Sequence, residues 1–75
     1  MFYKGDIVEK VKITTEFIKL DQFLKWVGMV GNGSDAKTII GEGEVKVNGE
    51  IEIRRGKKLR ANDIIEVNGK TFQIE

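Results

Sequence analysis

The sequence contains no cysteine and no histidine. Their absence excludes disulfides, thiol nucleophiles, zinc sites built from the usual ligands, and any Ser-His or Cys-His catalytic pair. The carboxylates that remain would need a cleft able to shift the pKa of one acid, and a chain of 75 residues offers little room for one. The composition therefore argues against an enzyme, and we expect no cofactor and no metal.

Long hydrophobic runs are also absent, so no segment is expected to span a bilayer. The N-terminal stretch "MFYKGDIVEK" meets charge at Lys4, Asp6 and Glu9, and it lacks the apolar centre of a secretory signal. With 40% hydrophobic and 33% charged residues, the composition is that of an ordinary soluble globular domain. We expect one domain over residues 1–75 that is cytoplasmic, monomeric and not attached to a membrane.

The spacing of apolar residues predicts a strand and then a helix in the first half of the chain. The segment Ile7–Thr14 alternates in part between apolar and polar residues, which predicts a short strand suited to a sheet edge. The next segment has apolar residues at the spacing of one helical face, and Gly28 can end that helix. These residues are Leu20, Phe23, Leu24 and Val27.

A second short helix is expected after a glycine-rich turn. Ser34 is a natural N-cap and Asp35 favours the first turn, while Gly41 and Gly43 close the helix. Its inward face comprises Ala36, Ile39 and Ile40. The stretch "GNGSDA" also matches a dinucleotide-binding pattern, but that pattern requires a preceding strand and a helix is expected there, so we interpret the glycines as turn residues.

The C-terminal half is expected to form two β hairpins. Asn48-Gly49 and Asn68-Gly69 are two-residue turns of the type that needs positive φ at both positions. We expect the first hairpin to place Val45, Val47, Ile51 and Ile53 on one face, and the second to contribute Ile65, Val67, Phe72 and Ile74. The fold class is therefore α+β, with a helix-turn-helix pair packed on a small antiparallel sheet.

The segment that connects the two hairpins is basic. "RRGKKLR", Arg54 to Arg60, holds five positive side chains in seven residues, although the formal net charge of the chain is only +1. A near-neutral protein with one basic strip is suited to bind nucleic acid or an acidic partner. The alternative is a solvated loop, because exposed lysine and arginine side chains are common.

From Ile18 onward the sequence resembles the RNA-binding domain named after small-subunit ribosomal protein four, the S-four domain. The resemblance rests on "IKLDQFLKWVGMVGNGSDAKTIIGEGEVKVNGEI": an apolar-basic-Leu-Asp start, a glycine turn, a Ser before the second helix, and a Gly-any-Val-any-Val-Asn-Gly run. "LRANDIIEV" is similar to the family's following segment. The core motif covers about residues 18–67, with residues 1–17 as an N-terminal extension. The chain resembles the stand-alone bacterial YaaA type.

The resemblance implies a non-catalytic module with the alpha-L fold, in which the helix pair and the following turn bind structured RNA. The implied partner is ribosomal RNA, in ribosome assembly or surveillance, or a tRNA-like RNA; a ribosomal particle is a further implied partner. Where the family usually has a basic residue after the Ser of the second helix, this chain has Asp35, which would repel phosphate but suits the helix start. The candidate RNA contacts are Lys19, Gln22, Lys25, Ser34, Lys37, Lys46, Asn48, Arg54, Arg55, Lys57, Lys58 and Arg60.

Two hypotheses of function remain open at this point. The first is an RNA-binding module that recognises shape through phosphates and 2′-hydroxyls. The second is a protein-interaction module whose basic strip docks on an acidic partner. A ubiquitin-like sulfur carrier is disfavoured because "FQIE" lacks a terminal Gly-Gly. Trp26 could stack on a looped-out base, but its position beside Leu24 and Val27 favours partial burial in the core.

Overall fold

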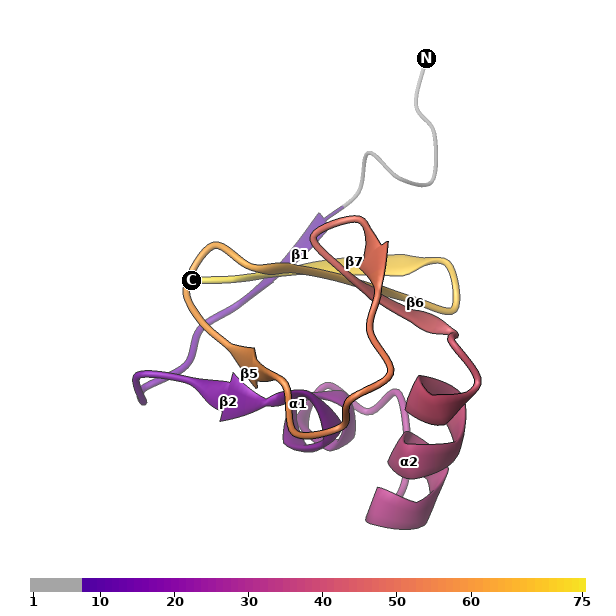
Figure 1. Ribbon diagram of the computed structural model, residues 1–75. Helices are drawn as coiled ribbons and strands as arrows, with labels where there is room; N and C mark the ends of the chain where they lie inside the picture. The colour runs from indigo at the N-terminus through magenta and orange to yellow at the C-terminus, as the bar shows by residue number, and fades with distance from the viewer. Residues whose placement is uncertain (1–7) are drawn as a thin grey trace.

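The computed structural model describes residues 8–75, and the part of the N-terminal extension before Val8 lies outside them. The two helices are α1 (Leu20–Trp26) and α2 (Gly33–Gly41). The strands are β1 (Val8–Val11), β2 (Ile18–Lys19), β3 (Val45–Val47), β4 (Glu50–Ile51), β5 (Lys58–Leu59), β6 (Ile64–Val67) and β7 (Lys70–Ile74). Both helices lie on one side of the main sheet (Figure 1). Within residues 8–75, neither helix is long and apolar enough to cross a membrane.

The main sheet has five strands in the order β1-β7-β6-β3-β4, and β2 and β5 form a separate two-stranded ribbon. The expected N-terminal strand is present as β1, at an edge of the sheet. It runs parallel to β7, with Val8 beside Thr71 and Val11 beside Ile74, while the other pairs are antiparallel. The sheet is therefore mixed, and the expectation of a purely antiparallel sheet was wrong on this point. The chain length between β1 and β7 allows a parallel pairing that local patterns do not reveal.

Both Asn-Gly turns have the predicted conformation. Their four residues all have positive φ: Asn48 at 53°, Gly49 at 86°, Asn68 at 50° and Gly69 at 75°. These values are those of turns whose twist matches the flanking strands. The second hairpin also buries all four of the apolar residues expected from it, namely Ile65, Val67, Phe72 and Ile74.

The face assignment of the first hairpin was wrong. A two-residue loop pairs Val47 with Glu50 and Lys46 with Ile51. Directly paired residues share a face of the sheet, so Ile51 lies on the face of Lys46 and not on that of Val47. Accordingly, Ile51 and Ile53 are 60% and 64% exposed, whereas Val47 is buried.

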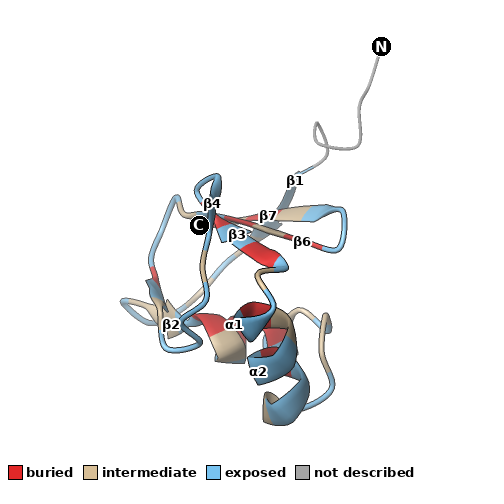
Figure 2. Ribbon diagram, turned by 45° about the vertical axis from the view of Figure 1, so that its right-hand side comes forward, coloured by how far each residue is buried: buried red, intermediate tan, exposed pale blue. Residues whose placement is uncertain are grey.

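The core lies between the helix pair and the main sheet, and Figure 2 shows buried residues on both layers. The ring of Phe23 from α1 meets Phe72 of β7 edge to face, with centroids 5.6 Å apart. Leu20, Phe23 and Leu24 are fully buried and Val27 packs partly against the core, which confirms the apolar face predicted for α1. The other buried side chains are Ala36, Ile40, Val45, Val47, Leu59, Ile65, Val67 and Ile74.

The helix ends agree with the sequence at one terminus and differ at another. Gly28 has a φ of 80° just after α1, as expected for a glycine that ends a helix. Ser34, however, is not the N-cap of α2. The cap is Asn32, whose Oδ1 accepts a hydrogen bond of 2.8 Å from the Asp35 N–H. Both residue types cap helices well, and here the helix begins one residue before Ser34.

Candidate nucleic-acid interface

The basic segment is part of the folded core. We expected Arg54–Arg60 to be a connection between hairpins, but it contains β5, which pairs antiparallel with β2. Leu59 of β5 is fully buried in the core. Leu59 and the pairing with β2 therefore fix the backbone of the segment in place, while the side chains of Arg54, Arg55, Lys58 and Arg60 remain exposed.

Backbone hydrogen bonds attach the same segment to the start of α1. The N–H of Leu20 donates to the carbonyl of Lys57 over 2.9 Å, and the N–H of Asp21 donates to the carbonyl of Arg55 over 3.0 Å. Lys19, at the N-cap position, provides no side-chain cap of its own. In Figure 1 the orange connection from β4 to β5 passes across the start of α1. The first N–H groups of the helix are thus occupied, so any attraction for anions at this point comes from side chains.

Lysines from two distant segments meet on the β2–β5 ribbon. Lys19 is paired directly with Lys58, and both are exposed. Like charges directly opposite each other destabilise a sheet. Within residues 8–75 the one salt bridge is between Arg54 and Glu52, so neither lysine has a carboxylate partner there. We call Lys19, Arg55, Lys57, Lys58 and Arg60 the cationic junction.

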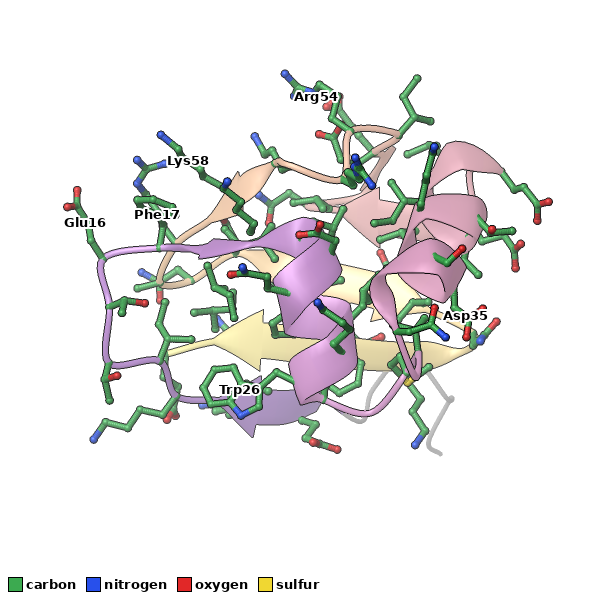
Figure 3. All side chains as sticks on the ribbon, turned by 90° about the horizontal axis from the view of Figure 1, so that it is seen from below. Glu16, Phe17, Trp26, Asp35, Arg54 and Lys58 are labelled. Carbon is green, nitrogen blue, oxygen red and sulfur yellow. The ribbon has the colours of Figure 1, made fainter. Side chains whose placement is uncertain are left out.

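An aromatic ring lies against two of these charges. The Lys58 Nζ is 4.8 Å from the centre of the Phe17 ring, and the Arg60 Cζ is 5.7 Å from it. Both distances fall in the range of cation–π attraction. Figure 3 shows Phe17 and Lys58 together beside Glu16. Phe17 thus holds two cations at one place on the surface, a role that sequence analysis did not assign to it.

Arg54 differs from the other cations because it has a partner. Its Nε donates to Glu52 Oε2 over 3.0 Å and its Nη2 to Oε1 over 3.1 Å, and its backbone N–H also donates to Glu52. The hydrogen bonds from Arg54 lower the pKa of Glu52 to about 2, although burial opposes this. The Arg54 side chain remains 71% exposed and that of Glu52 only 13%. Arg54 therefore has donors left for a ligand, but its charge is already balanced.

Asn48 has a structural role in the turn. Its Nδ2 donates to Asp63 Oδ1 over 3.1 Å, and its Oδ1 accepts from the Ile64 N–H over 2.9 Å. Asp63 also accepts from the Arg60 N–H over 2.8 Å through its other oxygen. Asn48 and Asp63 thus hold the turn and the end of the basic segment together. This explains the acidic residue in "LRANDIIEV", which the sequence indicated only through the resemblance.

Two shallow hollows flank the basic segment. One, of about 480 Å³, is lined by Arg54, Gly56, Lys57, Lys58 and Arg60. The other, of about 360 Å³, brings Asn48 beside Arg54 and Lys57, together with Val47, Glu50, Ile51 and Glu52. Within residues 8–75, no group of three acidic side chains is arranged to hold a metal ion. The charged side chains lining the first hollow are all cationic, which suits it to acceptor-rich ligands such as phosphates, whereas the second hollow also contains the carboxylates of Glu50 and Glu52.

Three sequence candidates lie away from the junction. Lys46 pairs directly with Glu66, and the alternation of strand residues puts it on the face opposite to the buried Val45 and Val47. Ser34 and Lys37 are exposed on α2. In Figure 3, Asp35 at the start of α2 lies at the other end of the molecule from Phe17 and Lys58.

The candidates on α1 are accessible. Gln22 and Lys25 are exposed, as expected for residues outside the apolar face. Trp26 is also 56% exposed, so the interpretation that favoured its partial burial in the core was wrong. The inward face of α1 is already complete without it, because Phe23 and Leu24 fill the space above the sheet.

The fold is that of the alpha-L motif. The solution structure of YbcJ from Escherichia coli, reported to reveal an "alfaL" motif involved in RNA binding, aligns with a TM-score of 0.63 and 30% identity over 89% of this chain and 84% of YbcJ. The ribosomal protein S4e of Thermoplasma acidophilum aligns with a TM-score of 0.60 and 22% identity over 80% of this chain and 32% of S4e, a likeness of fold alone.

A family model described as the S4 domain matches residues 11–75, and the chain belongs to this S4 (S-four) family. The match extends beyond the core motif expected at 18–67. Among relatives, the chain is 43% identical to the "Probable ribosome maturation protein RlbA" of Bacillus subtilis, over 85% of this chain and 92% of RlbA. It is 35% identical to the "Putative RNA-binding protein YbcJ" of Escherichia coli, over 76% of this chain and 81% of YbcJ.

Proposed function

We propose that this chain is a monomeric, non-catalytic module that binds structured RNA, with ribosomal RNA as the target and ribosome assembly or surveillance as the setting. The contact surface is the cationic junction together with the exposed side of α1. Sequence specificity is modest, because Lys and Arg side chains here meet phosphates and because A-form RNA hides its base edges in a deep groove.

The observation that carries this proposal is the direct pairing of Lys19 with Lys58. The fold tolerates two like charges in adjacent positions and holds a third, on Arg60, against the same aromatic ring as Lys58. Such an arrangement costs stability unless an anion lies between the charges. A polyphosphate backbone satisfies this requirement, and each phosphate neutralised releases counterions.

The relatives support the same partner. RlbA carries a name that refers to ribosome maturation, and YbcJ carries one that refers to RNA binding. Both are matched over most of their length, so the likeness is not confined to a small part of either relative. This chain shares the fold of YbcJ, and the cationic junction has no carboxylate partner within residues 8–75. Both features suit it to bind RNA.

A matched pair of double variants tests the proposal. Lys19→Gln with Lys58→Gln removes two charges from the junction, and Lys10→Gln with Lys46→Gln removes two from other places. Each lowers the formal net charge from +1 by two, to −1. Filter binding to a ribosomal RNA hairpin at four salt concentrations then gives the slope of log affinity against log salt. We expect the junction variant to flatten this slope by about 1.4 to 1.8, at roughly 0.7 to 0.9 per phosphate contact.

The control variant should leave both affinity and slope close to those of the wild type. Equal losses in the two variants would mean that net charge alone drives binding, and the proposal would fail. Preserved RNA binding, together with lost binding to an acidic protein such as a poly-glutamate-tailed domain, would favour the alternative of a protein-docking module. Co-sedimentation of the wild type with ribosomal particles, and its loss in the junction variant, tests the cellular setting.

A further inference from the structure

Trp26 is the single tryptophan of the chain, and it is largely exposed. Burying an indole ring in the core would stabilise the fold, and this chain gives up that stabilisation by leaving the ring in water. Within residues 8–75, the other exposed large hydrophobic residues belong to the main sheet or lie within two residues of one of its strands: Val8, Ile51, Ile53 and Ile64. Trp26 is therefore an isolated aromatic side chain on the helix layer, apart from any larger apolar patch of the helices.

The residues that share its side of α1 are polar or cationic. Gln22 and Trp26 are four residues apart, which places them along one stripe of α1, and Lys19 precedes this stripe at the N-cap position of the helix; all three are exposed. Lys25 is adjacent to Trp26 and also exposed. At about 1.5 Å per residue, Trp26 lies roughly 10 Å along the helix axis from Lys19. Figure 3 shows Trp26 at the end of α1 away from Phe17 and Lys58.

A nucleobase fits this setting better than an apolar protein surface. Every base has a π-face that stacks on an aromatic ring, and its phosphates need cations close by. The stripe and the N-cap position before it supply the ring at one end and paired lysines at the other, with the Gln22 amide between them as donor and acceptor. An apolar protein partner would instead have to desolvate Lys25 and Gln22 beside the ring, which is unfavourable.

We propose that Trp26 is a stacking site for an unpaired nucleobase, so that the chain prefers RNA helices carrying a bulged or looped-out nucleotide over continuous duplexes. This inference rests on the proposed function and adds a selectivity to it. The cationic junction holds the backbone, and the stacked base sets the position of the protein along the RNA.

Two RNA hairpins that differ by one bulged nucleotide test this directly. Stacking contributes about five- to 150-fold in affinity per base, and we expect the wild type to prefer the bulged hairpin by at least about fivefold. Because Trp26 is the only tryptophan, its fluorescence should be quenched on saturation with the bulged hairpin, and much less with the continuous one. Trp26→Leu removes the ring, and Trp26→Phe keeps one; neither should alter the fold, since the side chain lies outside the core cluster.

The expected outcome is that Trp26→Leu binds both hairpins equally, with the salt slope of the wild type, and that Trp26→Phe retains most of the preference. A preference that survives in Trp26→Leu, or fluorescence that is unchanged on saturation, would overturn the stacking site while leaving the proposed RNA binding intact. Absence of binding to either hairpin by the wild type would overturn both.

Discussion

Replacing Lys19 with glutamine should stabilise the fold and weaken RNA binding at the same time. In the folded chain Lys19 lies directly opposite Lys58 and also occupies the N-cap position of α1, where a positive charge opposes the helix dipole. Glutamine relieves both repulsions. The two effects are worth about 0.3 to 1 kcal/mol together, since both groups are exposed and screened. For a domain of this size that raises Tm by about 1 to 8 °C.

Thermal unfolding at low and high salt is the appropriate assay. The gain should shrink as salt rises, because the screening length falls from about 10 Å at 0.1 M to about 3 Å at 1 M. RNA affinity, measured on the same samples, should fall. The slope of log affinity against log salt should flatten by roughly 0.7 to 0.9, the value for one lost phosphate contact. Lys58→Gln should weaken RNA binding as much but stabilise less, because it also loses the attraction between Lys58 and Phe17.

Lys46→Gln is the matched control, because Lys46 has the carboxylate of Glu66 opposite it rather than a second lysine. It should leave RNA binding unchanged and give no gain in Tm. Two results would refute the account in which Lys19 and Lys58 repel each other and together bind RNA. One is a lower Tm for Lys19→Gln at low salt, and the other is an equal rise in Tm for Lys46→Gln.

Three further substitutions probe the supporting structure. Arg54 holds the pKa of Glu52 at about 2 instead of 4.5, so the pair stabilises the fold above pH 4.5 and this contribution is lost as the pH falls towards 2. Glu52→Gln should therefore reduce the loss of unfolding free energy between pH 4.5 and pH 2, measured by unfolding at a series of pH values. Asn48→Ala should destabilise more than Asn68→Ala by about 1 to 2 kcal/mol in urea titrations, since both sites have positive φ but Asn48 also makes two side-chain hydrogen bonds. Asp35→Arg should change RNA affinity by less than about twofold in filter binding, because Asp35 lies at the other end of the molecule from Phe17 and Lys58 and surface charges are screened by salt. Tighter binding would place the start of α2 in the interface.

Local sequence patterns predicted the elements whose formation depends on neighbours in the chain. The apolar face of α1 and both Asn-Gly turns were predicted correctly, because helical spacing and positive φ are imposed by residues a few positions apart. The face of Ile51 was predicted wrongly, although the loop length that determines it was known. A two-residue turn fixes the pairing of Val47 with Glu50, so Glu50 shares the face of Val47. The next residue, Ile51, therefore points to the opposite face.

Long-range pairings could not be read from such patterns. β2 and β5 are two residues each and about 40 residues apart, and only Leu59 signals that the basic segment is anchored in the core. The partners of Arg54 and Asn48 depend on these pairings, so sequence analysis gave the candidate residues without their roles. The role of Phe17 was missed because Lys58 and Arg60, which lie over its ring in the fold, are about 40 residues away in the sequence. No local pattern around Phe17 indicates these contacts.

An NMR titration of the labelled protein with a structured ribosomal RNA tests the central claim most directly, since backbone amides report contact residue by residue. The account predicts that the largest shift changes fall on Lys19, Gln22 and residues 55–60, with small changes on the opposite face of the sheet at Lys46, Glu66 and Thr71. Largest changes on that opposite face, with residues 55–60 unaffected, would contradict the claim that the cationic junction holds the RNA.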